Sequence, residues 1–283
     1  MPKLNKTIVD IGVPTSRNQL PAFWRSIMAL DWGGGAMLTA EGALTDTNRN
    51  NIVDEFLFQR KDESEYLFFV DDDVEVPSHA IEQMLSWDKP FVAGIYYRRS
   101  PPCDPLIYRK REDGWYRSLL PEQDYETGDL IPIDACGMGC TLIHRSVFQQ
   151  IIETHFLYRR HNKSFGFMHY SAVDEVEAKF EPGVHVSDGS AYLVQKMQPF
   201  SVELLGPKET LPFFALEYGR TEDFHFCELA KAAGVEIYAD TGIECNHWGA
   251  LPIGRTQHFQ VRDWMDKNEV QNVDGIAIQE IKV

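Results

Sequence analysis

A short, wholly apolar segment that ends in three consecutive aspartates constrains this chain more than any other feature. Residues 66–70 read YLFFV, and Asp71, Asp72 and Asp73 follow directly. A run so short and so continuously apolar indicates a strand covered on both faces, as in a parallel sheet flanked by helices. Open α/β sheets bind their ligands at the carboxyl ends of their strands. We therefore expect the three aspartates at a ligand-binding edge of such a sheet.

The segments on either side of this strand alternate as a doubly wound α/β domain requires. Residues 7–13, TIVDIGV, form a β-rich run before a polar turn, and residues 90–97, PFVAGIYY, predict a further strand. Apolar spacing predicts two helices between these strands, one capped by Asp46 or Thr47 and one opening at Pro77. The order strand, helix, strand, helix, strand is typical of a doubly wound sheet.

The second half of the chain differs from the first in composition and periodicity. Residues 101–140 are rich in turns and short β-like pieces, which predicts antiparallel elements. Residues 155–210 combine aromatic and charged side chains with weak periodicity, which favours a long loop or lid. Thr221 is predicted to cap a helix that runs to Gly234, followed by the strand VEIYA.

Length and charge limit the classes of protein that fit. The 283 residues correspond to roughly 1.9 typical domains, so two small domains or one large α/β unit are allowed. Hydrophobic residues make up 43% and charged residues 25%, the usage of an ordinary folded domain. The net charge of −16 repels nucleic acid backbones and anionic lipid. Any anionic ligand must therefore be held by a local arrangement of donors.

The cysteines and the apolar runs indicate a reducing compartment. The number of cysteines is odd and their spacing fits no zinc ribbon or finger, which favours reduced core thiols at Cys103, Cys136, Cys140, Cys227 and Cys245. No apolar run approaches the ~18 residues of a membrane span, and the first residues do not resemble a signal peptide. We expect a cytoplasmic protein.

Several strings, taken together in their order along the chain, resemble the motifs of family 2-like glycosyltransferases of the GT-A fold. They are IGVPTSRN, YLFFVDDDVEVP, FVAGIYYRR, DACGMGCTLIHRSVF and GRTEDFHFCELAKAAGVEIYADTGIECNHWG, and the resemblance extends over residues 6–250. It implies an α/β domain with a GT-A-type mixed, mostly parallel central sheet flanked by helices. That domain would span residues 1–250, with a nucleotide-sugar-binding half at about 1–100, an acceptor-binding half at about 101–250 that includes the long loop, and a C-terminal extension at 251–283.

The resemblance also implies a divalent metal site. Asp71 and Asp73 match the DxD pair, with Asp71 nearer the donor ribose, and His247 matches the late histidine that completes the metal shell. Carboxylate plus imidazole suits Mn²⁺ better than Mg²⁺, although either ion fits the oxygen ligands. The competing interpretations are an acidic turn facing solvent and a histidine packed beside Trp248.

Glu222 and Asp223 resemble the family's catalytic acidic pair, in which the aspartate accepts the proton of the acceptor hydroxyl. Glycosyl transfer requires such a base, since a hydroxyl has a pKa far above 7. The alternative is structural, because acidic side chains in the first turn of a helix stabilise it through the macrodipole.

Donor contacts follow from the same resemblance. The positions that match donor-binding residues are Pro14, Thr15, Arg49, Asp71, Asp72, Gly137 and Gly139. Arg49 is predicted in the first turn of its helix, within reach of a diphosphate; a solvated surface arginine is the alternative. The two glycines would let the donor sugar approach the backbone, or else form a tight turn in a hairpin. Further local positive spots on this acidic chain are Arg98, Arg99, Arg159 and Arg160. They could bind an anionic acceptor or the diphosphate; the alternative is solvated or salt-bridged surface arginines.

The resulting hypothesis is a metal-dependent transferase that moves a sugar from a nucleoside diphosphate sugar to an acceptor hydroxyl, with inversion. The acceptor is left open between a glycan, a small molecule and a hydroxymethylated DNA base, the last fitting a phage-encoded enzyme acting inside its host cell. A nucleotidyltransferase and a non-catalytic nucleotide-sugar-binding protein are the competing classes. No glycine-rich, lysine-bearing phosphate loop supports the former.

Overall fold

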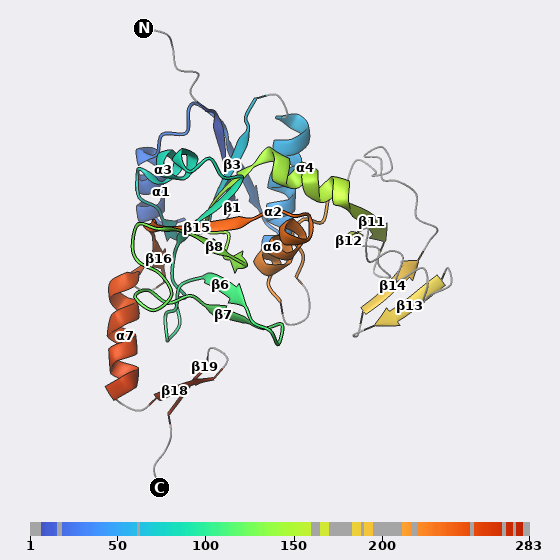
Figure 1. The fold of residues 1–283 in the computed structure, drawn as a ribbon. Helices are drawn as coiled ribbons and strands as arrows, with labels where there is room; N and C mark the ends of the chain where they lie inside the picture. The colour runs from blue at the N-terminus through green and yellow to red at the C-terminus, as the bar shows by residue number, and fades with distance from the viewer. Residues whose placement is uncertain are drawn as a thin grey trace.

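The molecule is built on a central mixed sheet of seven strands flanked by helices (Figure 1). The computed structural model describes residues 7–15, 19–60, 63–159, 165–169, 183–187, 190–194, 211–216, 220–249, 252–267, 270–273 and 276–279. Along the sheet the order is β2 (Met37–Glu41), β1 (Val9–Thr15), β3 (Tyr66–Val70), β10 (Cys140–His144), β5 (Phe91–Ile95), β15 (Ile237–Glu244) and β8 (Leu130–Ile133).

Most of these strands share one direction, which confirms the expected fold class. Strands β2, β1, β3, β5 and β15 run the same way, whereas β10 and β8 are antiparallel to their neighbours. The mixture arises because β10 enters between β3 and β5, two strands that the sequence places much earlier. This arrangement is compatible with the GT-A-type sheet that the sequence motifs imply.

Strand β3 has the bounds predicted from its apolar run, and it is buried on both faces. Successive side chains of a strand point to opposite faces of the sheet. Leu67 and Phe69 therefore join the core cluster on one face, and Phe68 and Val70 join the cluster on the other. The chain leaves this doubly covered strand at Asp71, at the carboxyl edge of the sheet.

Helices cover both faces of the sheet. They are α1 (Pro21–Ala29), α2 (Thr45–Asp54) with a π-helical continuation (Glu55–Gln59), α3 (Ala80–Ser86), α4 (Arg145–Thr154) and α6 (Glu222–Ala232). A further helix, α7 (Arg255–Lys267), lies below the central sheet in Figure 1. The predicted cap of α2 is wrong: Leu44 occupies the N-cap and makes no side-chain cap, because the Asp46 carboxylate accepts from the Thr47 amide instead. Arg49 consequently lies two or three residues deeper in the helix than expected and falls beyond its first turn.

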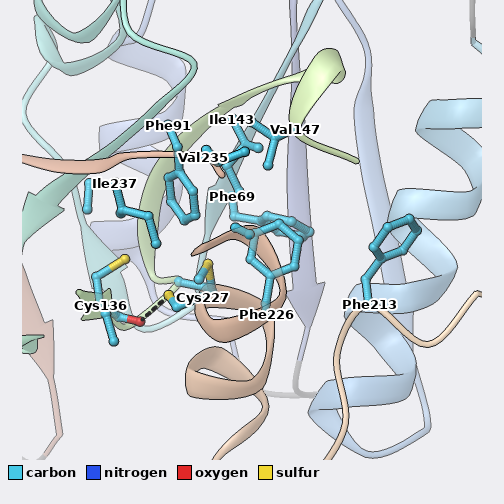
Figure 2. Packing of buried hydrophobic residues seen from close by; sticks show 14 of the residues in the cluster. Phe69, Phe91, Cys136, Ile143, Val147, Phe213, Phe226, Cys227, Val235 and Ile237 are labelled. Carbon is cyan, nitrogen blue, oxygen red and sulfur yellow. Dashed lines mark hydrogen bonds between the residues drawn. The ribbon is translucent and has the colours of Figure 1, made fainter. Parts of the chain in front are cut away.

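Helix α6 is anchored by its apolar face (Figure 2). Phe226 and Cys227 point into the core beside Phe69 and Phe91, and the Cys227 thiol donates to the carbonyl oxygen of Cys136 at 3.8 Å. Thr221 is the N-cap residue, as predicted, although its side chain makes no capping hydrogen bond. This packing fixes the first turn of α6 against the sheet edge.

The turn-rich region forms the antiparallel elements that were predicted. They are β6 (Ile107–Lys110), β7 (Tyr116–Ser118) and β9 (Ala135–Cys136), which make a three-stranded sheet. A second three-stranded sheet joins β4 (Val74–Glu75), β16 (Asn246–Trp248) and β17 (Pro252–Ile253). In it His247 is the register partner of Val74, and the Trp248 amide donates to the Asp73 carbonyl oxygen at 2.8 Å.

The segment 155–210, predicted as a long loop, contains two hairpins. Strand β11 (His155–Arg159) pairs with β12 (Phe165–His169), and β13 (Gly183–Ser187) pairs with β14 (Ser190–Val194). Antiparallel pairing of adjacent strands supplies the backbone hydrogen bonds that a loop would lack; the rest of the segment lies outside the described residues. A third hairpin follows α7, formed by β18 (Val270–Val273) and β19 (Ile276–Gln279).

Two further expectations can be compared with the structure. All five cysteines are buried and free, which confirms the prediction of reduced core thiols. None of the described helices combines the length and the apolar character needed to cross a lipid bilayer.

Candidate active site

A fully buried arginine lies at the centre of the acidic residues singled out from the sequence. The Arg49 side chain is 1% exposed, and its Nη2 donates to Asp71 Oδ1 at 2.9 Å. Its Nε lies 3.5 Å from Asp223 Oδ1 and 3.7 Å from Glu222 Oε1. One guanidinium thus joins the aspartate after β3 to the acidic pair that opens α6, residues more than 150 positions apart in sequence.

Burial and mutual repulsion set the charge states in this cluster. Burial raises the pKa of Asp223 to about 7; Arg49 opposes this shift, and Glu222 and Asp71 add to it. Burial raises the pKa of Asp71 as well, again against the attraction of Arg49. Burial would lower the pKa of Arg49, but the three carboxylates raise it above its usual value, so the guanidinium stays charged. Asp223 is therefore a carboxyl that can exchange a proton near neutral pH.

Several polar atoms of the cluster make ion-pair contacts at most and no hydrogen bond. Among the described residues, Arg49 Nε and Nη1 and Asp223 Oδ1 are buried without a hydrogen bond. The separation of 3.5 Å between Nε and Oδ1 exceeds the usual length of an N–H···O bond. The Asp223 side chain nevertheless keeps 18% of its surface exposed, so a small polar group can reach it.

Asp73 and His247 form a second pair at the same sheet edge. His247 Nε2 lies 3.4 Å from Asp73 Oδ1, and His247 Nδ1 lies 2.8 Å from the carbonyl oxygen of Tyr97. A carbonyl only accepts, so Nδ1 holds the ring proton in the neutral imidazole and Nε2 presents a lone pair to the carboxylate. Two facing lone pairs require a proton or a cation between them. A backbone carbonyl behind the outer nitrogen is also the usual support of a metal-binding histidine.

This pair therefore fits a divalent cation as two of its ligands. The pKa of Asp73 is lowered: burial alone would raise it, but a hydrogen bond and positive charge from His247, together with the charge of Arg99, outweigh burial. A divalent cation in place of that proton would act in the same direction and keep the carboxylate ionised, as a ligand must be. The predicted three-residue set of Asp71, Asp73 and His247 stays a prediction. In the described part of the chain no three His, Cys, Asp or Glu side chains gather closely enough to hold an ion. Within that set, Asp71 Oδ1 accepts a hydrogen bond from Arg49 Nη2.

The predicted donor-binding residues of the first strand lie at this edge too. The Thr15 hydroxyl donates to Asp72 Oδ2 at 3.0 Å, and Gln19 Nε2 donates to Thr15 Oγ1 at 2.6 Å. Pro14 lies within β1, in register with Ala40 of β2. The structure thus brings Thr15 beside the aspartate triplet, whereas the rest of the predicted donor loop, residues 16–18, lies outside the described residues.

Gly137 and Gly139 make room for a side chain that the sequence reasoning missed. The Tyr96 hydroxyl accepts from the Gly139 amide at 3.1 Å, and a Cβ built on Gly137 would lie 2.0 Å from that hydroxyl oxygen. A Cβ on Gly139 would lie 3.0 Å from Asp71 Oδ2. Burial, together with Asp71 and Asp223, raises the pKa of Tyr96 well above its usual value, so its hydroxyl stays protonated. The only hint in the sequence is the tyrosine pair that ends the predicted strand 90–97.

Replacing Gly137 by Ala should destabilise the protein by about 1–3 kcal/mol, because the new methyl group overlaps the Tyr96 hydroxyl and forces the buried ring to shift. Urea unfolding of Gly137→Ala would measure the loss. Adding Tyr96→Phe removes the hydroxyl and should restore part of the stability. If the single and double variants lose the same free energy of unfolding, the absence of a Cβ at Gly137 is not what accommodates the Tyr96 hydroxyl.

The arginines noted in the sequence have different surroundings. Arg99 Nη1 donates to Asp73 Oδ2 at 2.7 Å, a contact that sequence spacing does not reveal. The Arg98 amide donates to the Asp104 carbonyl oxygen in a loop. The side chain of Arg159 and the whole of Arg160 lie outside what the structure describes.

Comparisons with known proteins place the chain near no characterised family. No family model matches it, and no curated protein matches it. Among solved structures it is similar to A197 from STIV, with 15% identity, coverage of 86% of each chain and a TM-score of 0.46. It is also similar to a glycosyltransferase involved in the glycosylation of the major capsid of PBCV-1, with 11% identity, coverage of 51% of this chain and 65% of that one, and a TM-score of 0.29. With both TM-scores below 0.5, neither likeness supports an assignment of activity.

Proposed function

We propose that this protein is a glycosyltransferase that moves a sugar from a nucleoside diphosphate sugar to an acceptor hydroxyl. One observation supports the proposal above the others: Arg49 connects Asp71 to Asp223, so that the aspartate triplet and a carboxyl with a near-neutral pKa lie in one cluster. A central sheet with two covered faces and a polar carboxyl edge is the kind of scaffold on which such sites are built.

Asp223 is the proposed general base. Its carboxylate would take the proton of the acceptor hydroxyl while that oxygen bonds to the anomeric carbon and the bond from this carbon to the diphosphate breaks. The diphosphate leaves with the electron pair of the broken bond. Attack by a base-activated hydroxyl from the side opposite the leaving group inverts the anomeric configuration. Glu222, 3.7 Å from the same guanidinium, would keep Arg49 in place beside the base.

Asp73 and His247 are the proposed ligands of a divalent ion, with Mn²⁺ preferred because one ligand is an imidazole. A bound divalent ion would stabilise the charge that develops on the departing diphosphate. The chain's own contribution is orientation: the Tyr97 carbonyl holds the His247 ring through Nδ1, and the backbone pairing of β4 with β16 holds the two ligands together.

The proposed binding positions of the donor and the acceptor follow from the same arrangement of residues. Pro14, Thr15 and Asp72 would lie against the nucleoside, and Gly137 and Gly139 near the donor sugar. The acceptor would approach the exposed fraction of Asp223. A glycan, a small metabolite and a hydroxymethylated DNA base each offer the hydroxyl that this chemistry requires.

The direct test is slow hydrolysis of the donor, which needs no knowledge of the acceptor. Incubated with Mn²⁺ and a panel of nucleotide sugars, the wild type should release the nucleoside diphosphate from one of them. Asp73→Asn, or added EDTA, should lower that rate by about tenfold or more, because a ligand or the ion itself is lost. The matched control is Asp113→Asn, an exposed carboxylate in the turn between β6 and β7.

Other results would contradict the proposal in recognisable ways. Release of pyrophosphate from a nucleoside triphosphate would indicate a nucleotidyltransferase. Donor binding by calorimetry, without hydrolysis or transfer to any acceptor offered, would indicate a binding protein. If Asp73→Asn, and the wild type with EDTA, both hydrolyse the donor at the full wild-type rate, the reaction does not depend on a metal ion.

A further inference from the structure

Arg99 occupies the side of Asp73 that faces solvent. Its Nη1 lies 2.7 Å from Asp73 Oδ2 and 3.4 Å from the carbonyl oxygen of Trp248. The other oxygen of the same carboxylate, Oδ1, faces His247 Nε2. The carboxylate is thus shared between an imidazole from the core side and a guanidinium from the surface.

The two partners of Asp73 differ in how firmly they are held. The His247 side chain is 11% exposed and fixed by the Tyr97 carbonyl, whereas the Arg99 side chain is 52% exposed. An exposed ion pair is worth little in water, so the guanidinium can leave at small cost. The imidazole and the carboxylate would stay in place when it does.

A divalent cation at Asp73 and His247 would carry two positive charges close to this guanidinium. Like charges at such a distance repel one another, and Asp73 cannot neutralise both. An anion that binds beside the cation reverses this balance and attracts the arginine. The planar fork of Arg suits the paired oxygens of a phosphate group better than a lysine would. On a chain with a net charge of −16, such a local donor is what a diphosphate requires.

We propose that Arg99 is an exchangeable counter-ion, which neutralises Asp73 while the metal is absent, is displaced by the divalent cation, and then binds the diphosphate of the nucleotide. The inference rests on the proposed function for the identity of the anion. It assigns Arg99 two opposite effects: competition with the cation and attraction of the nucleotide. Removing a residue that only supports the local fold would not raise the affinity for the cation and lower the affinity for the nucleotide.

The experiment measures both ligands in wild type and Arg99→Ala. Free Mn²⁺ is followed by electron paramagnetic resonance during titration without nucleotide, and UDP and GDP are then titrated by calorimetry at saturating Mn²⁺. Arg99→Ala should bind Mn²⁺ about two- to fivefold more tightly, the range of an exposed ion pair. It should bind the preferred nucleoside diphosphate about tenfold more weakly, because a charge-assisted contact is lost. Arg111→Ala, an exposed arginine paired with Asp113, should change neither value.

Each alternative outcome overturns the inference. Unchanged or weaker Mn²⁺ binding in Arg99→Ala, or no Mn²⁺ binding by the wild type, would exclude the counter-ion role. Unchanged nucleotide binding would exclude the diphosphate contact. Both titrations are independent of sugar transfer, so a protein that transfers no sugar would contradict the proposed function while leaving this binding pattern intact.

Discussion

Asp223→Asn should lower sugar transfer by about 10²–10⁴-fold, the contribution of a positioned general base. The amide keeps the shape of the side chain but cannot accept the proton of the acceptor hydroxyl. Binding of the nucleotide donor should change little, because the Asp73 and His247 pair is untouched. Initial rates of transfer and donor titration by calorimetry separate these two effects.

The same residue sets the expected pH dependence. Because burial raises the pKa of Asp223 to about 7, the carboxyl is largely protonated below pH 6 and unable to act as a base. Transfer by the wild type should therefore rise with pH through about 7 and level off above it. The residual activity of Asp223→Asn should lack this rise. A wild-type profile that is flat between pH 5 and 9 would contradict the assignment.

Arg49→Met should destabilise the folded protein by about 3–5 kcal/mol, the range found when one partner of a buried ion pair is removed. Asp71 and Asp223 would lose the positive charge that holds them together, and Arg49 itself is 1% exposed. Arg49→Lys keeps a charge without the fork geometry and should lose less stability. Urea unfolding at two pH values measures both variants.

The way in which the stability loss of Arg49→Met varies with pH gives a sharper test than the magnitude of the loss. The pKa of Asp223 is raised on folding from about 4 to about 7, so the folded state binds more protons in that window and wild-type stability falls as pH rises through it. Arg49 lowers the pKa of both Asp71 and Asp223. Without Arg49 the pKa values of both carboxyls rise, so the decline of stability continues to higher pH. The free energy of unfolding of Arg49→Met should therefore fall further below that of the wild type at pH 8 than at pH 5.

A double variant provides the control. Adding Asp223→Asn to Arg49→Met removes one of the uncompensated carboxylates and should recover part of the stability at pH 8. Equal losses at both pH values, or no recovery in the double variant, would show that Arg49 acts through packing against Phe69 and Phe214 rather than through charge.

Local patterns were sufficient to predict the elements with the strongest periodicity. Residues 66–70 form β3 with the predicted bounds, and α6 begins after Thr221 as expected, because apolar runs and capping residues act within a few positions. The insertion of β10 between β3 and β5 depends on pairing across distant segments, which no local pattern encodes. The hairpins within 155–210 were missed because their alternation is weak.

The candidate site divides in the same way. Sequence motifs singled out Asp71, Asp73, Asp223 and His247 as candidates, and the structure places them near one another. What they could not identify is the partner of each charge. Arg49 was placed near the donor from its position in a helix, yet its burial commits it to carboxylates, and its role as a donor contact stays a prediction. Which groups a charged side chain pairs with depends on how deeply it is buried, and burial cannot be read from a single sequence.

The backbone pairing of β4 with β16 sets the framework of the proposed ion site independently of its side chains. Main-chain hydrogen bonds, including that from the Trp248 amide to the Asp73 carbonyl, set how far apart the two ligand positions lie. Neither ligand side chain contributes to those bonds. If the proposed ion binds at this edge, its selectivity can therefore be redesigned by exchanging the side chains at positions 73 and 247 while the backbone spacing between them stays unchanged.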